Sequence, residues 1–277
     1  MTARLIDGRA HAAAIVSEAA AMAGTLPVTP TLAVLVPTSD ATSDWYVRNI
    51  ERTAAKAGVS VLVERLDGAS GVEIAARLDA LSRDDSVHGI ICQTPLPAGL
   101  SLAEVSAHID PDKDVDGANP TSLGRLAAGQ PAYAPATAAA VLELLEREQI
   151  PLEGVRVTVV GRSTVVGKPV ALLLLAQHAT VTVCHSHTVD LAAVCRGADV
   201  LVVAAGRAGL VTTEFVQPGA VVIDVGTNPT SDGGLIGDVD AAVATTAGAL
   251  TPVPGGVGPV TTALLLRHVV TAASLLG

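Results

Sequence analysis

The chain has 277 residues, of which 49% are hydrophobic and 16% charged, so it has enough apolar material to bury a large core. Its formal net charge of -10, with no cluster of Lys or Arg, argues against nucleic acid and anionic membranes as partners, because both require a concentrated positive surface. The three cysteines are too few for a disulfide framework, no signal-peptide pattern opens the sequence, and no uninterrupted apolar run reaches the roughly 18 residues of a membrane helix. We therefore expect a soluble, cytoplasmic protein.

Short β-branched runs alternate along the chain with helical patterns rich in Ala and Leu. The runs occupy residues 31–36, 59–66, 87–93, 155–161, 180–186, 200–206 and 220–226. Nearly continuous apolar strands separated by helices are typical of parallel sheets covered by helices on both faces. The sequence therefore predicts an α/β fold.

A polar passage rich in Pro and Gly, residues 108–137, separates the first three strands from the last four. It predicts a domain boundary near residue 135 and a cleft beside it. The final helix, residues 258–276, has no strand after it and is expected to pack on the first domain. The expected division is 1–135 plus 260–277 for the first domain and 136–259 for the second.

Residues 155–188 read as strand, glycine turn, helix and strand, the pattern of a nucleotide-binding unit. Gly161 can adopt a turn conformation closed to bulkier residues, and Gly167 lets the helix approach the sheet and leaves its N-terminus free for an anion. The spacing is G-x5-G and not G-x-G-x-x-G, so the turn alone is weak support for a nucleotide site.

The end of the second strand in this segment bears on cofactor choice. Where an NAD site offers Asp or Glu to the ribose, this chain has Cys184, His185 and Ser186. Arg162 and Ser186 together suit a 2'-phosphate, because no carboxylate repels it, and this favours NADP. The alternative is a surface arginine and a loop serine with no ligand.

Eight separate stretches resemble the methylenetetrahydrofolate dehydrogenase/cyclohydrolase family, usually called FolD. In chain order they are S-x-x-Y-V from Ser43, Q-x-P-L-P from Gln93, D-P-x-K-D-V-D-G from Asp110, N-P-T-S-L-G-R-L from Asn119, V-G-R-S-x-x-V-G-x-P from Val160, I-D-V-G from Ile223, G-D-V from Gly237 and T-P-V-P-G-G-V-G-P-V-T from Thr251.

The resemblance implies a folate-binding catalytic domain followed by a Rossmann-like NADP-binding domain with a parallel sheet, in a homodimer without a metal. The implied folate side comprises Tyr46, Gln93, Asp116, Pro254, Gly255, Gly256, Val257 and Gly258. The implied cofactor side comprises Gly161, Arg162, Ser163, Gly167, Ser186 and Thr227. Tyr46, Gln93 and Asp116 are the expected catalytic residues.

Two of these side chains have a specific chemistry. A pterin presents two parallel N–H donors that one carboxylate accepts together, and Asp116 is the residue expected to do so, although a loop Asp can also cap a turn. Tyr46 is expected to stack on the pterin, where an ordinary Tyr would be a half-buried core residue. Trp45 has no matching role in the family and is expected to be a packing residue.

The family places a lysine four residues after the motif tyrosine, and here that residue is Ile50. Hydride transfer depends mainly on alignment, whereas hydrolysis of the methenyl group requires proton transfers that isoleucine cannot perform. Arg48 and Arg52 lie about 200° around the helix from Ile50, and Lys56 is also off the Tyr46 face.

The leading hypothesis is an NADP-dependent dehydrogenase whose cyclohydrolase activity is lost or weak, as in monofunctional members of the family. One alternative retains both activities through another proton carrier, such as Gln93 with a bound water. A second alternative is a noncatalytic NADP- and folate-binding paralogue. Departures from the family pattern at residues 36–43, at Thr94 and at residues 135–140 all border the folate side, whereas the G-R-S-x-x-V-G-x-P motif of the cofactor side is intact.

Overall fold

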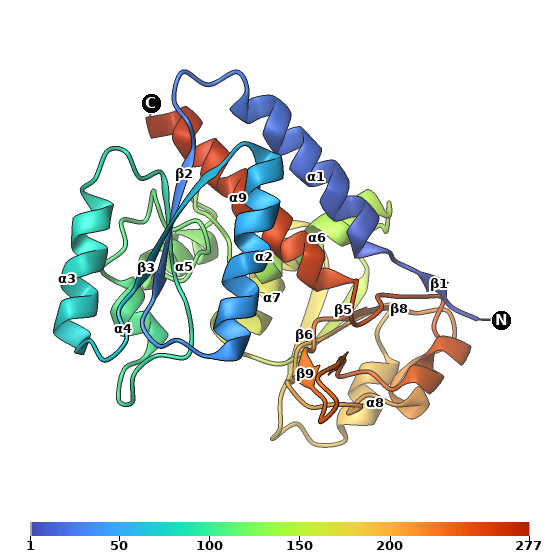
Figure 1. Ribbon diagram of the computed structural model, residues 1–277. Helices are drawn as coiled ribbons and strands as arrows, with labels where there is room; N and C mark the ends of the chain where they lie inside the picture. Colours follow the sequence, from blue (N-terminus) through green and yellow to red (C-terminus); the bar gives the residue numbers. More distant parts are fainter. Residues whose placement is uncertain (1, 277) are drawn as a thin grey trace. The chain divides into compact units, whose positions relative to one another are not determined.

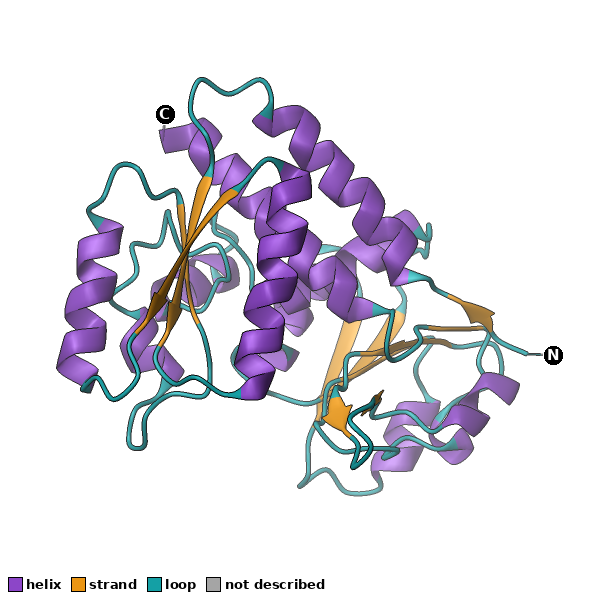
Figure 2. Cartoon of the chain, viewed as in Figure 1, coloured by secondary structure: helices purple, strands orange, loops and turns teal. Residues whose placement is uncertain are grey.

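The computed structural model describes residues 2–276 and consists of two compact α/β units, drawn in Figures 1 and 2. Unit 1 contains residues 2–12 and 137–261, and unit 2 contains residues 13–136 and 262–276. The divisions lie within two residues of those expected at 135 and 260. Residues 2–12 differ from the expectation, because β1 (Arg4–Leu5) pairs in parallel with β11 (Ala249–Leu250) and so joins unit 1.

Unit 2 is built on a three-stranded parallel sheet in the order β3-β2-β4. Its strands are β2 (Thr31–Val36), β3 (Ser60–Arg65) and β4 (Gly89–Cys92). Its helices are α2 (Ala41–Ala57), α3 (Gly71–Ser82), α4 (Leu102–Ser106), α5 (Pro120–Ala127) and most of α1 (Gly8–Ala23) and α9 (Val257–Leu276).

The central strand β2 is buried on both faces, as its continuous apolar sequence predicts. Ala33 and Leu35 pack into a cluster with residues of α3 and α4, whereas Leu32, Val34 and Val36 pack into a second cluster with α1, α2 and α9. Successive strand residues point to opposite faces, so helices cover both sides of the sheet.

The final helix α9 lies in the core of unit 2, as predicted, with Leu265, Leu266 and Val269 buried against β2 and α2. By length and composition α9 is apolar enough to cross a membrane, but 61% of its most apolar window is buried inside the protein. Such burial is typical of a helix that packs in a protein core.

Unit 1 contains a six-stranded parallel sheet in the order β1-β11-β8-β7-β5-β6. Its other strands are β5 (Arg156–Val160), β6 (Thr180–Cys184), β7 (Val200–Val203) and β8 (Val221–Asp224), with a separate antiparallel pair formed by β9 (Asn228–Pro229) and β10 (Leu235–Ile236). Its helices are α6 (Ala136–Arg147), α7 (Gly167–Ala176), α8 (Leu191–Arg196), and the short 3-10 turns η1 (Thr213–Phe215) and η2 (Ala241–Thr245). The parallel sheets confirm the predicted α/β class.

Candidate functional site

Tyr46 and Ile50 lie one helical turn apart on the inner face of α2. Ile50 is fully buried and belongs to the apolar cluster formed with β2 and α9, against which the partly exposed Tyr46 also packs. Arg48, Arg52 and Lys56 are exposed, so none of these cations replaces a lysine on that face. The expectation from helical spacing is confirmed, and position 50 is an apolar packing position.

The hydroxyl of Tyr46 lies in a polar cluster with Thr262 and Asp116. Thr262, in α9, is 3% exposed and forms a side-chain hydrogen bond with the phenol. Burial raises the pKa of Tyr46 above its usual value of 10.0, and the negative charge of Asp116 raises it further. The phenol therefore stays protonated at neutral pH and can donate a hydrogen bond.

Asp116 is held by a backbone hydrogen bond and is followed by a closely packed glycine. The backbone N–H of Ala136, at the start of α6, donates to its carboxylate. The next residue, Gly117, has a φ of 61°, and a Cβ there would lie 2.5 Å from the backbone nitrogen of Pro135, so only glycine fits. The proposed substrate-binding residue thus also has the capping role that the sequence left open.

The pKa of Asp116 is raised from 3.8 to about 7, chiefly by burial and then by the nearby charge of Asp114. Asp114 is fully buried and accepts hydrogen bonds from the backbone of Ala118 and Asn119 and from the Ser122 hydroxyl, so it organises the start of α5. Its role is structural. Asp116 is a titratable group with a pKa near neutrality, a property that is common at functional sites.

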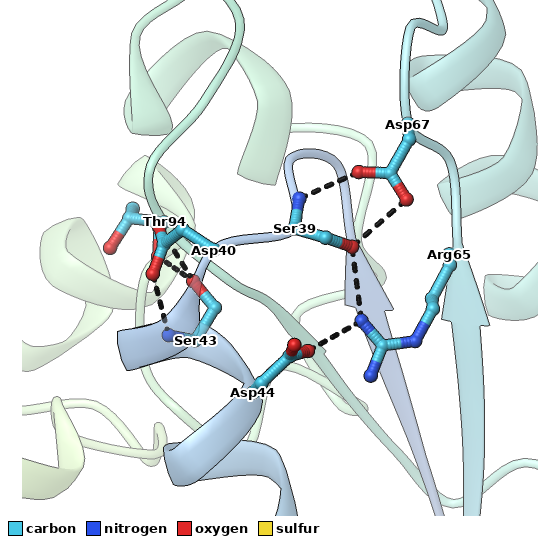
Figure 3. A network of polar contacts seen from close by, with 7 residues as sticks. All are labelled: Ser39, Asp40, Ser43, Asp44, Arg65, Asp67 and Thr94. Carbon is cyan, nitrogen blue, oxygen red and sulfur yellow. Dashed lines mark hydrogen bonds and ion pairs between the residues drawn. The ribbon is translucent and has the colours of Figure 1, made fainter.

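Gln93 is the first residue after β4, and its loop is tied to the start of α2. Its backbone N–H donates to Leu35 at 2.8 Å. Figure 3 shows Ser43, which is 3% exposed, between the carboxylate of Asp40 and the carbonyl of Thr94. The Ser43 backbone N–H donates to Asp40 at 2.9 Å, and its hydroxyl lies 3.1 Å from the Thr94 carbonyl oxygen. The motif serine therefore positions the loop that carries Gln93.

The rest of the network in Figure 3 fixes the loop between β2 and α2. Arg65, the last residue of β3, donates to Asp44 at 2.7 Å and to the Ser39 hydroxyl at 3.0 Å. Asp67 accepts from the Ser39 backbone at 2.6 Å and from its hydroxyl at 2.9 Å. The segment that departs from the family pattern is thus ordered by contacts of its own.

Trp45 is exposed, with 57% of its surface accessible, so its expected packing role was wrong. Adjacent helix residues are rotated by about 100°, which carries Trp45 off the face that buries Tyr46 and Ile50.

In unit 1, the Gly161 turn follows β5 and is packed too closely for a side chain. Gly161 has a φ of 128°, and a Cβ there would lie 2.2 Å from the carbonyl oxygen of Ala204. A Cβ on Gly167 would lie 2.2 Å from the carbonyl oxygen of Gly161. Both glycines are therefore required by close backbone approach, as the sequence predicted.

The N-terminus of α7 is not free for an anion, contrary to the expectation. The Ser163 hydroxyl accepts from the backbone of Val166 and Gly167 at 3.1 and 3.4 Å, and the Ser163 carbonyl accepts from Lys168 at 3.0 Å. Pro169 has no N–H, so the first turn of the helix is satisfied by the chain itself.

The unsatisfied donors instead lie just before the helix. Among residues 2–276, no acceptor is recorded for the four successive backbone N–H groups of residues 162–165. Arg162 and Ser186 are exposed at the ends of the paired strands β5 and β6, and no described carboxylate pairs with Arg162. Consecutive open N–H groups beside an unpaired guanidinium fit the phosphates of a dinucleotide. Thr227 is exposed after β8.

The loop at residues 254–258 also lies in unit 1 and is packed against the start of α1. A Cβ on Gly8 would lie 1.7 Å from the carbonyl oxygen of Gly256, and one on Gly255 would lie 2.7 Å from the Arg9 guanidinium. Gly255 has a φ of 115°, and Gly258 is exposed. The loop presents backbone at close range, as its Pro/Gly composition predicted.

Sequence reasoning missed Thr262, and it missed the buried pair Asp224 and Asp238, whose carboxylates organise the loops after β7 and β8. The motifs I-D-V-G and G-D-V carried a signal for this pair, since each has an Asp within two residues of a Gly, but they did not reveal the hydrogen-bond partners. No group of three or more His, Cys, Asp or Glu suited to a metal occurs within the described part of the chain.

Fold and geometry together define a two-unit α/β protein with a nucleotide-binding turn, and comparison with known proteins identifies the family. The model of the tetrahydrofolate dehydrogenase/cyclohydrolase catalytic domain matches residues 6–116, and that of the NAD(P)-binding domain of the same family matches residues 135–276. The chain therefore belongs to the tetrahydrofolate dehydrogenase/cyclohydrolase family, as the resemblance indicated.

Relatives match along nearly the whole chain. The bifunctional protein FolD of Parafrankia sp. (strain EAN1pec) is 61% identical over 275 residues, which cover 98% of this chain and 99% of that protein. The crystal structure of the bifunctional enzyme FolD from Campylobacter jejuni has a TM-score of 0.95 at 38% identity and covers 98% of both chains. The Trypanosoma brucei dehydrogenase-cyclohydrolase, complexed with NADP cofactor and inhibitor, has a TM-score of 0.93 at 37% identity and covers 99% of this chain and 98% of that one.

Proposed function

We propose that this protein catalyses the NADP-dependent oxidation of 5,10-methylenetetrahydrofolate and the hydrolysis of the resulting 5,10-methenyl group. The observation that carries the proposal is the 61% identity, across nearly the full length of both chains, to a relative named as bifunctional. The sequence alone favoured loss of the second activity, whereas the named relatives favour the bifunctional alternative. NADP as the cofactor is supported by the Trypanosoma complex and by Arg162 and Ser186.

The residues of unit 1 would hold the cofactor, whose nicotinamide supplies the hydride acceptor. The open N–H groups of residues 162–165 suit its phosphates, and Arg162 with the Ser186 hydroxyl suits a 2'-phosphate. Thr227 is a further candidate contact. Hydride transfer then depends on alignment and asks no proton transfer of the protein.

Asp116 is the proposed pterin-binding group, because one carboxylate can accept two parallel N–H donors. Ring opening additionally needs a base for the attacking water and an acid for the departing nitrogen. Ile50 can be neither. We assign these transfers to a water held by Gln93, because the Asp116 carboxylate is engaged by the N–H donors at the other edge of the pterin.

A second candidate is a dehydrogenase without cyclohydrolase activity. The observation that favours it is Ile50, fully buried where the family resemblance expects an ammonium group. General acid-base catalysis typically contributes ~10² to 10⁴ in rate, enough to make one activity undetectable beside the other.

One experiment separates the candidates. Purified protein is mixed with methylenetetrahydrofolate and NADP⁺, and both NADPH and the methenyl chromophore are followed. Added methenyltetrahydrofolate that is hydrolysed faster than in a buffer blank supports the bifunctional proposal. Methenyl accumulation in step with NADPH, at the blank rate of hydrolysis, supports the second candidate. Failure to form NADPH contradicts both and leaves the noncatalytic paralogue.

A homodimer and a cytoplasmic location remain part of the proposal. Sedimentation equilibrium of the purified protein tests the first, since a single species of monomer mass would contradict it.

A further inference from the structure

Asp238 is a fully buried carboxylate in unit 1 that receives an unusual set of donors. The backbone N–H groups of Ala205, Gly206 and Arg207 reach it at 2.7, 2.8 and 2.8 Å, and the Asn228 amide donates at 2.9 Å. Three consecutive N–H groups converging on one anion form a nest of the kind that often binds phosphate. Here the chain fills that nest with its own side chain.

The loop held by Asp238 lies directly against the Gly161 turn. The Ala204 backbone N–H donates to Val160 at 2.8 Å, and the Ala204 carbonyl oxygen occupies the space that a Cβ on Gly161 would need, 2.2 Å away. A shift of residues 204–207 therefore cannot leave Gly161 in place. The carboxylate acts on the turn through one intervening backbone segment.

Asp224 holds Asp238 in turn. Its carboxylate accepts from the backbone of Gly226, Asp238 and Val239 at 2.9, 3.0 and 3.0 Å. The two motif glycines are constrained reciprocally, because a Cβ on Gly226 would lie 2.4 Å from the Asp238 carboxyl carbon and one on Gly237 would lie 1.8 Å from an Asp224 carboxylate oxygen. The I-D-V-G and G-D-V motifs therefore pack directly against each other, and each aspartate fixes the backbone of the other motif or the loop beside it.

From these contacts we infer that Asp238 is a positioning residue for the NADP phosphates: it fixes residues 204–207 and, through them, the Gly161 turn with the open N–H groups of residues 162–165. The inference rests on the proposed use of NADP. In this role Asp238 touches neither the cofactor nor the reacting atoms. Its carboxylate occupies the N–H groups of residues 205–207, so these groups are not available to a second anion beside the Gly161 turn.

The test replaces Asp238 with Asn and measures NADP binding by calorimetry. Asparagine presents an NH₂ group where one oxygen accepted N–H donors, so at least one of the three loop amides loses its acceptor. We expect the dissociation constant for NADP to rise by roughly tenfold or more, the effect of losing a charge-assisted hydrogen bond that fixes a binding loop. The kcat of dehydrogenation at saturating NADP should change less than the KM for NADP.

Asp199→Asn is the matched control. Asp199 directly precedes β7 in the same sheet. It accepts hydrogen bonds from the backbone of Arg156, the first residue of β5, at 3.2 Å and from the Arg156 guanidinium at 2.9 Å. Its loss is expected to lower thermal stability without weakening NADP binding beyond about twofold. If both variants lose NADP affinity in proportion to their loss of stability, Asp238 is merely structural and the inference is wrong.

Two further results are decisive. Asp238→Asn binding NADP as tightly as the unaltered protein overturns the inference alone, whereas no NADP binding by the unaltered protein overturns the proposed cofactor. Amide hydrogen exchange of the unaltered protein, followed by NMR, covers the case in which the variant does not fold. The amides of residues 205–207 should exchange as slowly as those of β7. Exchange as fast as that of residues 231–234, in the turn between β9 and β10, would show that Asp238 does not hold this loop.

Discussion

Ile50 follows Tyr46 by one turn of α2 and is fully buried, whereas Tyr46 is partly buried and its hydroxyl is hydrogen-bonded to Thr262. The position that carries an ammonium group in the family pattern therefore belongs to the core of unit 2. Substitutions at position 50 can therefore change the packing of unit 2, measured as stability, independently of proton transfer, measured as methenyl hydrolysis.

Ile50→Lys is expected to destabilise the protein and to change methenyl hydrolysis by less than about tenfold. Burying an ammonium group costs several kcal/mol, which corresponds to a fall in melting temperature of several degrees or more. Under the bifunctional proposal, hydrolysis does not depend on position 50. Calorimetry and the methenyl assay measure the two effects.

Ile50→Met is the control, because it keeps the apolar character and similar volume and should cost less than ~1.5 kcal/mol. A gain in hydrolysis of ~10² to 10⁴ in the lysine variant would transfer support to the dehydrogenase-only candidate.

The fold was largely predictable because its main strands are continuous apolar runs between helical patterns. The seven predicted strands are all present, shortened at their ends by up to three residues. The strands β1, β9, β10 and β11 were not predicted, because two residues cannot show a periodicity. The pairing of β1 with β11 joins opposite ends of the chain and leaves no local signal, which is why residues 2–12 were assigned to the other domain.

The candidate site was predictable where a motif fixes a residue type and not where tertiary contacts decide. Spacing along α2 placed Tyr46 and Ile50 correctly on one face, but the lack of a family role for Trp45 led to a packing assignment that its exposure contradicts. Thr262 looks like any threonine within a helix until its hydroxyl is seen beside Tyr46. Likewise, the Ser163 contacts that occupy the start of α7 follow from the shape of the turn and not from its sequence.

Asp116→Asn is expected to raise the KM for the folate substrate about 10- to 100-fold, because a charge-assisted pair of hydrogen bonds contributes roughly 1.5–3 kcal/mol. NADP affinity should be unchanged. Asp112→Asn provides a matched control on the same loop, since Asp112 is exposed and pairs with Arg125 at the surface. An unchanged folate KM in Asp116→Asn would remove Asp116 from the binding site.

The pH dependence of stability offers an independent test of Asp116. Its pKa in the folded protein, about 7, lies above the ordinary 3.8. The folded state therefore binds this proton more tightly than the unfolded state, and the associated stability is complete below pH ~4 and lost as the pH rises through about 7. Relative to the unaltered protein, Asp116→Asn should gain stability between pH 5 and pH 8, measured by urea unfolding at each pH. A constant difference across that range would show that Asp116 does not titrate there.

Thr262→Val is expected to lower stability by about 1–3 kcal/mol, because it leaves the buried hydroxyl of Tyr46 without its partner. Thr262→Ser keeps the hydroxyl and should retain most of that stability. In a Tyr46→Phe background the Thr262→Val change should cost much less, since the hydrogen bond is already absent. Additive losses in the double-mutant cycle would mean that the two hydroxyls do not interact.

Arg162→Ala tests cofactor selection. The guanidinium has no described carboxylate partner and lies after β5, beside the end of β6 that carries Ser186. If it pairs with the 2'-phosphate, its removal should weaken NADP binding about 10- to 100-fold and leave NAD binding nearly unchanged, because only NADP carries that group.

Arg196→Ala is the control, since this exposed arginine of α8 donates to the backbone of Glu214 and is assigned no ligand. Calorimetric titration of each variant with both nucleotides measures the ratio. Equal losses for NADP and NAD would place Arg162 at the shared pyrophosphate and remove the argument for NADP selectivity from this residue.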